Sequence, residues 1–356
     1  MIWVTWRQHR TTILTAVGGI LALTFVALIC GLIVRNSNTA ASFGSLFGCS
    51  LDDDPAACWA ASTLTLVSLV TVMLPVVLGV LVGVTVFSRD IERGCHVLGL
   101  SQDVSRTRWY WMRVLVVFGP VTVAMVILGS VLEWTLIRLE STNLAYGYSR
   151  FAGGHSRLTF PLFQSSGIVA GAYTLLALIL GSCLALLLRN TLGAMAVTVI
   201  AMATVLVGFQ VGARPHYAEA VVDRHAMDSS TGRYVSYEPS NDRFTSWVLS
   251  SGLVDANGKT ARIDYATCDL TYSSYEEDDR PDETRADYDS RMDALWAEQN
   301  RQYIECLRAQ GADHYEVRYH SDSLFRRFQA TEAALALALS ALLLIPSLWA
   351  LRRLRP

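Results

Sequence analysis

The sequence predicts an all-α polytopic membrane protein with six transmembrane helices, both termini in the cytoplasm, and a small α+β extracellular domain between spans five and six. The 356 residues are 52% hydrophobic and 17% charged, whereas soluble domains carry roughly 25% charged residues. The charge is uneven: 22 acidic and 14 basic residues lie between Ala213 and Arg327, which leaves 9 acidic and 15 basic residues elsewhere. This composition argues against a water-soluble enzyme, a disordered chain, a coiled coil and a nucleic-acid-binding protein.

Six apolar stretches have about the length that a helix needs to cross roughly 30 Å of hydrocarbon. None has Lys, Arg, Asp or Glu in its central part, whereas core helices of soluble proteins rarely lack charge on every face. The first stretch is too long for a signal peptide, and no Ala-x-Ala site follows it. The predicted spans are Ile13–Val34, Ala61–Phe87, Val114–Leu132, Ile168–Leu188, Thr191–Val211 and Ala333–Trp349.

Arginine placement gives the expected orientation, because short cytoplasmic loops are rich in Lys and Arg. Trp3, Trp6, Arg7 and Arg10 suit a cytoplasmic interfacial segment over residues 1–12. The remaining domain boundaries follow from the spans: spans one to five over 13–212, with a cytoplasmic loop at 88–113; the outer domain at 213–327; and span six with a basic tail over 328–356. Basic residues gather on the predicted inner side at Arg89, Arg93, Arg106, Arg108, Arg113, Arg189, Arg352, Arg353 and Arg355, while Arg138, Arg150 and Arg157 run against the trend.

The outer segment between spans five and six has the composition of a small soluble domain. Alternating residues predict strands at Thr245–Leu249 and Glu316–Tyr319, and helical spacing predicts a helix over Asp287–Leu307. The acidic stretch Tyr275–Arg285 is expected to be a mobile loop rather than a cation site, because it lacks calcium-loop spacing.

Four of the seven cysteines fall on the predicted outer, oxidising side. Cys49 and Cys58 share the first outer loop, and Cys268 and Cys306 share the outer domain. Two local disulfides are expected, although free thiols or a Cys49–Cys306 pairing stay possible because sequence does not determine connectivity.

No catalytic set and no metal site is found in the sequence. Gly252–Thr260 ends like a phosphate-binding loop but has five residues between its glycines instead of four, so a turn is expected. The histidines lack zinc-helix spacing and are expected at the surface: His216, His225, His314 and His320. ATP-driven work would therefore require a second polypeptide.

The spans offer two kinds of candidate for a translocation route. Glu133 and Glu332 lie near outer span ends, where they could line an exit or serve as interfacial anchors. Pro75 can kink span two, and Gly79 and Gly83 permit close helix approach.

Span five carries small and polar residues, including Thr198 and Thr204. In a twofold assembly, the commonest symmetry, spans two and five are the predicted walls of the route. The alternative is that their small residues only pack helices within one chain.

The cytoplasmic segment from Phe87 to Met112 has mixed charge around a short apolar stretch, which suits docking to a partner. Ser101 or Asp103 is expected to cap the helix that enters span three. The segment resembles the span-two to span-three connection of type-2 ATP-binding-cassette (ABC) permeases, especially those of high-GC Gram-positive (actinobacterial) species. Two positions depart from that pattern, Asp90 replacing Glu and Cys95 replacing Thr. The matching residues are Arg89, Asp90, Glu92, Gly94, Ser101, Gln102, Val104, Ser105, Arg106, Arg108 and Trp109.

The resemblance implies a half-transporter whose coupling helix is seated on a separate ATPase that binds ATP and Mg. It implies export of an amphipathic or lipidic substrate, such as a drug, antibiotic, peptide or lipid, by a dimer with a second copy or a related permease in the cell membrane. No enzymatic activity and no bound cofactor are expected for this chain. The alternative function is a membrane sensor or assembly factor whose outer domain binds a ligand or a protein. The expected coupling residues are Asp90, Glu92, Arg93, Gly94, Ser101, Gln102, Arg106 and Arg108.

Overall fold

The structure is a computed structural model that describes residues 2–36, 55–92, 105–139, 156–227, 246–268 and 283–353. It divides into two compact units. The helical unit comprises Met1–Ala218 and Asp322–Pro356, and the inserted unit comprises Glu219–Ser321.

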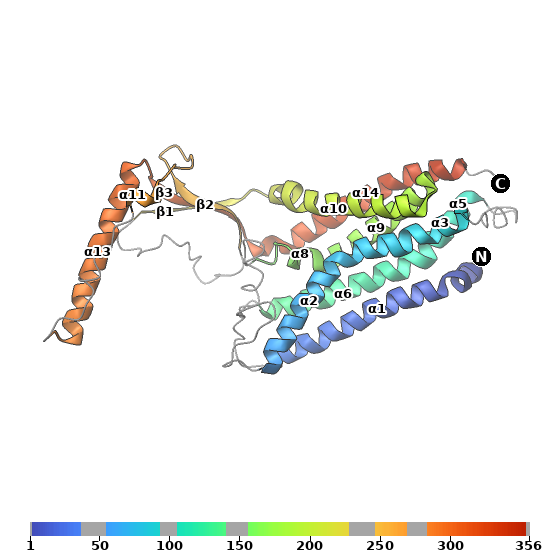
Figure 1. Cartoon of the computed structure of the whole chain (residues 1–356), viewed down its shortest axis with the longest axis horizontal. Helices are drawn as coiled ribbons and strands as arrows, with labels where there is room; N and C mark the ends of the chain where they lie inside the picture. The colour runs from blue at the N-terminus through green and yellow to red at the C-terminus, as the bar shows by residue number, and fades with distance from the viewer. Residues whose placement is uncertain are drawn as a thin grey trace. The chain divides into compact units, whose positions relative to one another are not determined.

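The helical unit consists of long antiparallel helices (Figure 1). Within the described ranges, six helices are long and apolar enough to cross a membrane, which confirms the six predicted spans. Three of them contain a π-helical stretch, a local widening of the helix. The elements are α1 (Ile2–Asn36); α2 (Pro55–Leu78), η1 (Gly79–Val84) and α3 (Thr85–Glu92); α5 (Arg106–Arg113), η2 (Val114–Phe118) and α6 (Gly119–Leu139); α8 (Leu162–Ser165) and α9 (Gly167–Leu188); α10 (Thr191–Val207), η3 (Gly208–Ala213) and η4 (Arg214–His216); and η6 (Asp322–Leu324) and α14 (Phe325–Arg352).

Several helix boundaries have a local cause in the sequence. Ser105 caps α5 by accepting a hydrogen bond from the Arg108 N–H, so the cap is neither Ser101 nor Asp103 as expected. Asn190 caps α10 in the same way through the Gly193 N–H. The first helix runs without a break from residue 2 to residue 36, so the expected interfacial segment is a continuation of span one rather than a separate element.

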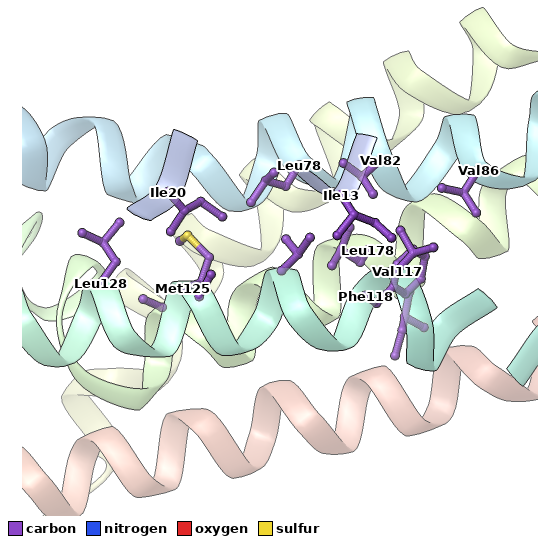
Figure 2. Packing of buried hydrophobic residues seen from close by; sticks show 14 of the residues in the cluster. Ile13, Ile20, Leu78, Val82, Val86, Val117, Phe118, Met125, Leu128 and Leu178 are labelled. Carbon is purple, nitrogen blue, oxygen red and sulfur yellow. The ribbon is translucent and has the colours of Figure 1, made fainter. Parts of the chain in front are cut away.

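The core of the helical unit is built around α9. In the most apolar stretch of α9, 72% of the residues are buried, against 22% in the span that contains α10. Both stretches have the same mean hydropathy of 2.2. Figure 2 shows how α1, α2, α6 and α9 contribute to one apolar cluster. Lipid tails are as apolar as the side chains, so the hydrophobic effect does not drive helices together in a membrane. Their association depends on close packing instead. The side chains labelled in the figure are Ile13, Ile20, Leu78, Val82, Val86, Val117, Phe118, Met125, Leu128 and Leu178.

Small residues bring span two and α9 into backbone contact. A Cβ added at Gly79 would lie 2.9 Å from the Ala177 carbonyl oxygen, and one at Gly83 would lie 2.8 Å from the Leu178 carbonyl oxygen. A Cβ at Gly181 would clash with the Gly79 carbonyl oxygen. The glycine pair therefore serves helix packing within one chain.

The inserted unit contains a three-stranded antiparallel sheet in the order β1-β3-β2. The strand β3 (His314–His320) covers the predicted strand Glu316–Tyr319. The strand β2 (Trp247–Val254) overlaps the predicted Thr245–Leu249 only from Trp247 on, and β1 (Val221–Ala226) was not foreseen. The predicted helix is α13 (Arg285–Ala309), and a short helix, α11 (Tyr265–Cys268), contacts it.

Three local predictions in the inserted unit can be compared with the structure. After β2, Asp255 accepts hydrogen bonds from the Asn257 and Lys259 N–H groups, so the phosphate-loop-like segment is a turn as predicted. His320 was expected at the surface, but it is buried and its ring lies 5.6 Å from that of Trp247. Most of the stretch expected as a mobile loop lies outside the described residues.

A disulfide joins Cys268 to Cys306 across a Cα–Cα distance of 5.7 Å, as predicted. Cys58 is also disulfide-bonded, but Cys49, its expected partner, lies outside the described residues. Among the described cysteines, Cys30 and Cys183 are free.

Candidate functional site

The candidate site lies at the end of the helical unit where α3 ends, α5 begins and α14 ends, which we call the α3–α5 end (Figure 1). Glu92, Arg106 and Arg108 of the predicted coupling residues are described with their side chains. Asp90 lies in α3. Arg93, Gly94, Ser101 and Gln102 lie outside the described residues.

Glu92, the last residue of α3, connects span two to span five. Its Oε1 atom accepts hydrogen bonds from the Thr191 N–H at 3.0 Å and the Thr191 hydroxyl at 2.6 Å. These bonds hold the pKa of the exposed Glu92 carboxyl below its ordinary value, and a carboxylate is favourable at the N-terminus of α10. Glu92 is thus a clasp between α3 and α10.

Arg106 connects span three to span six. Its Nη1 atom donates to the Arg352 carbonyl oxygen at 3.0 Å, in the last turn of α14, where carbonyl groups lack partners within the helix. Arg108 differs from Arg106, because its side chain is exposed and its backbone N–H forms part of the α5 cap.

Arg113 is a functional candidate that the sequence did not single out beyond its charge. It is buried, and its Nη1 atom donates to the Val86 carbonyl oxygen at 2.8 Å. Its guanidinium carbon lies 4.3 Å from the centre of the Trp109 ring, a stabilising cation–π geometry. The aromatic residues beside Arg113 in the sequence were the only available signal.

The α3–α5 end therefore links four spans through polar contacts. Glu92 joins span two to span five, Arg106 joins span three to span six, and Arg113 joins span three to span two.

The predicted route residues lie in span two and span five, two helices that contact each other within the chain. Pro75, Gly79 and Gly83 are buried, and both glycines approach α9 of the same chain. Thr198 is buried and Thr204 is exposed, and each hydroxyl bonds to its own helix. A role for these residues in a route stays a prediction.

The six apolar helices define a polytopic membrane protein, and polar contacts join several of them at the α3–α5 end. The family model described as "ABC-2 membrane transporter related" matches residues 14–214, which is more than half of the chain. The chain belongs to this family of ABC-2 type membrane transporters. No curated protein and no solved structure matches the chain.

Proposed function

We propose that this chain is the permease subunit of an ABC exporter that moves an amphipathic or lipidic substrate with energy from a separate ATPase. The observation that carries the proposal is the linkage of four spans at the α3–α5 end. ATP and Mg would be bound by the partner, and this chain would convert the partner's movement into a rearrangement of its spans.

The segment between Glu92 and Ser105 is the proposed contact with the ATPase. Its two flanks, α3 and α5, are held by contacts to α10 and α14. A partner that pushes on this segment would move helices whose ends are already connected. The match of this segment to the high-GC Gram-positive subgroup rests on its sequence pattern alone.

We place both termini and the α3–α5 end in the cytoplasm of a cell-membrane protein, with the inserted unit outside. Arginine enrichment at the α3–α5 end supports this orientation. The Cys268–Cys306 disulfide in the inserted unit supports it as well, since disulfides persist in oxidising compartments.

The exporter would be a dimer with a second copy or a related permease, and spans two and five would face the route. The low burial of α10 within one chain supports a partner on that helix. The absence of ionisable residues from the centres of the six apolar stretches fits a substrate with a large apolar part.

Co-expression with the ATPase encoded nearest to this chain tests the proposal. The two proteins should co-purify, and this chain should stimulate ATP hydrolysis in lipid vesicles. Scrambling residues 93–104 should abolish both effects. If the scrambled chain behaves like the wild type, the alternative of a membrane sensor or assembly factor would be favoured; an ATPase lacking its phosphate-binding lysine is the control.

A further inference from the structure

The end of the helical unit opposite to the α3–α5 end contains α8 and is called the α8 end. There, Arg214 and Glu332 form an ion pair whose side chains are both 0% exposed. The Arg214 Nε and Nη2 atoms donate to the two oxygens of Glu332 at 3.0 and 2.7 Å. Arg214 lies at the end of span five and Glu332 belongs to span six, so the pair joins the two helices between which the inserted unit is placed in the chain.

The pair also holds the segments on either side of α8. Arg214 Nη1 donates to the Leu158 carbonyl oxygen at 3.2 Å, and its guanidinium carbon lies 3.9 Å from the centre of the Phe163 ring. The Tyr173 hydroxyl of α9 donates to Glu332. Glu332 is fully buried in this arrangement, and the two roles expected for it, lining an exit and interfacial anchoring, stay predictions.

A second contact lies one turn earlier on α14. The Gln329 amide donates to the Phe163 and Ser166 carbonyl oxygens at 2.9 and 3.2 Å and accepts from the Val169 N–H at 3.2 Å. The corner between α8 and α9 is therefore attached to α14 at two levels, and the ion pair adds the end of span five.

Charged residues are a costly way to hold helices together. A buried ion pair loses the hydration of both charges, and a well-packed apolar pair of similar volume gives equal or greater stability. An ion pair and an apolar pair differ when the helices that they join separate and water enters. Each separated charge regains its hydration, whereas separated apolar side chains expose their surface to water. An ion pair therefore suits a contact between helices that separates into water better than an apolar pair does.

We propose that Arg214 and Glu332 form a reversible latch that closes the α8 end and separates when ATP binding by the partner opens this end to water. The latch rests on the proposed function as a permease. The separation breaks the Arg214–Glu332 contacts and hydrates both side chains, and no bond or proton needs to be exchanged.

The test uses the full complex with its ATPase in lipid vesicles. Leu158, which is 0% exposed, is replaced by cysteine as a reporter for a membrane-impermeant maleimide, and the complex without this replacement gives the background of the native cysteines. ATP with Mg should increase the labelling rate about tenfold or more in the complex with the native ion pair.

The double variant R214M/E332L replaces the ion pair by apolar side chains. It should assemble with the ATPase and show no increase in labelling with ATP. The matched control R285M/D289L, which removes an exposed ion pair of α13, should label like the wild type.

Two results would overturn the latch: no effect of ATP on labelling with the native pair, or ATP-dependent labelling that persists in R214M/E332L. Failure of the native chain to bind its ATPase is a separate outcome, which would contradict the permease function itself.

Discussion

The two ends of the helical unit are held by different kinds of contact. At the α3–α5 end, exposed Glu92 and partly exposed Arg106 each bond to one residue of another helix. At the α8 end, Arg214, Glu332 and Gln329 are buried, and each contacts two or more elements. Arg113 is buried at the α3–α5 end as well, but the bonds of that end to α10 and α14 are made by exposed or partly exposed side chains, whereas those of the α8 end are made by buried ones.

The two ends of the helices therefore differ in how easily their contacts can be broken and remade. Exposed polar contacts contribute little to stability and can be remade when a partner binds. Buried polar networks specify one arrangement, because each unsatisfied group is costly. In the proposed transporter, the α3–α5 end receives the movement and the α8 end determines which closed state the helices return to.

The largest expected effect is at the α8 end. Glu332→Leu should lower the free energy of unfolding by about 3–5 kcal/mol, because Arg214 would stay buried without its counter-charge. Denaturation of the detergent-purified protein measures this change. The matched control Glu305→Leu, at an exposed position of α13, should change stability by less than about 0.5 kcal/mol. Equal effects of the two variants would remove the distinction between the ends.

An intermediate effect is expected where the spans pack between the two ends. Gly181→Ala places a methyl group against the Gly79 carbonyl oxygen and should cost about 1–3 kcal/mol of stability through overpacking. Gly18→Ala in α1, which has no atom within 4 Å of the added carbon, should instead stabilise the helix by up to about 1 kcal/mol. Thermal unfolding of both variants checks the opposite signs, and a neutral Gly181→Ala would contradict the close approach of span two to α9.

The smallest effect on stability is expected at the α3–α5 end. Glu92→Ala should hardly change the melting temperature at neutral pH but should weaken ATP-dependent coupling between spans two and five. In the Glu92→Ala background, Thr191→Val should add little, because both substitutions remove the same bond. If Glu92→Ala lowered the melting temperature as strongly as Glu332→Leu, the bond of Glu92 would serve mainly to stabilise the fold.

The pH dependence of the Glu92 bond has a definite sign. Because the folded protein lowers the pKa of Glu92 from its ordinary value of 4.5, the bond contributes fully above that value and is lost as the pH falls through the lower folded pKa. The small difference in melting temperature between wild type and Glu92→Ala should therefore vanish in acid. Melting curves at pH 7 and at about pH 3 measure it, and a difference that grows in acid would rule out the carboxylate as the acceptor.

The sequence predicts the spans well because crossing lipid requires about 20 apolar residues, a property of local composition. It does not predict which span is central, since α9 and α10 have equal hydropathy but different burial. The Arg214–Glu332 pair was missed because the partners are 118 residues apart and composition assigned Arg214 to the outer domain. The clasp between Glu92 and Thr191 spans 99 residues and likewise depends on tertiary packing.

The inserted unit shows the same limits on a smaller scale. Helix α13 follows from its apolar spacing, whereas β1, with the sequence Val-Val-Asp-Arg-His-Ala, has no alternating pattern and is stabilised by pairing with β3. The cap of α5 was assigned to the wrong residue because several Ser and Asp residues precede that helix, and only the backbone position selects Ser105.

The central claim is that the α3–α5 end receives an ATPase. Photo-crosslinking residues introduced at exposed Arg108 and at Trp59, which is 62% exposed in the first turns of α2, test this claim directly in the native complex. The account predicts a covalent adduct with the ATPase from position 108 and none from position 59. An adduct from position 59 but not from position 108 would contradict it.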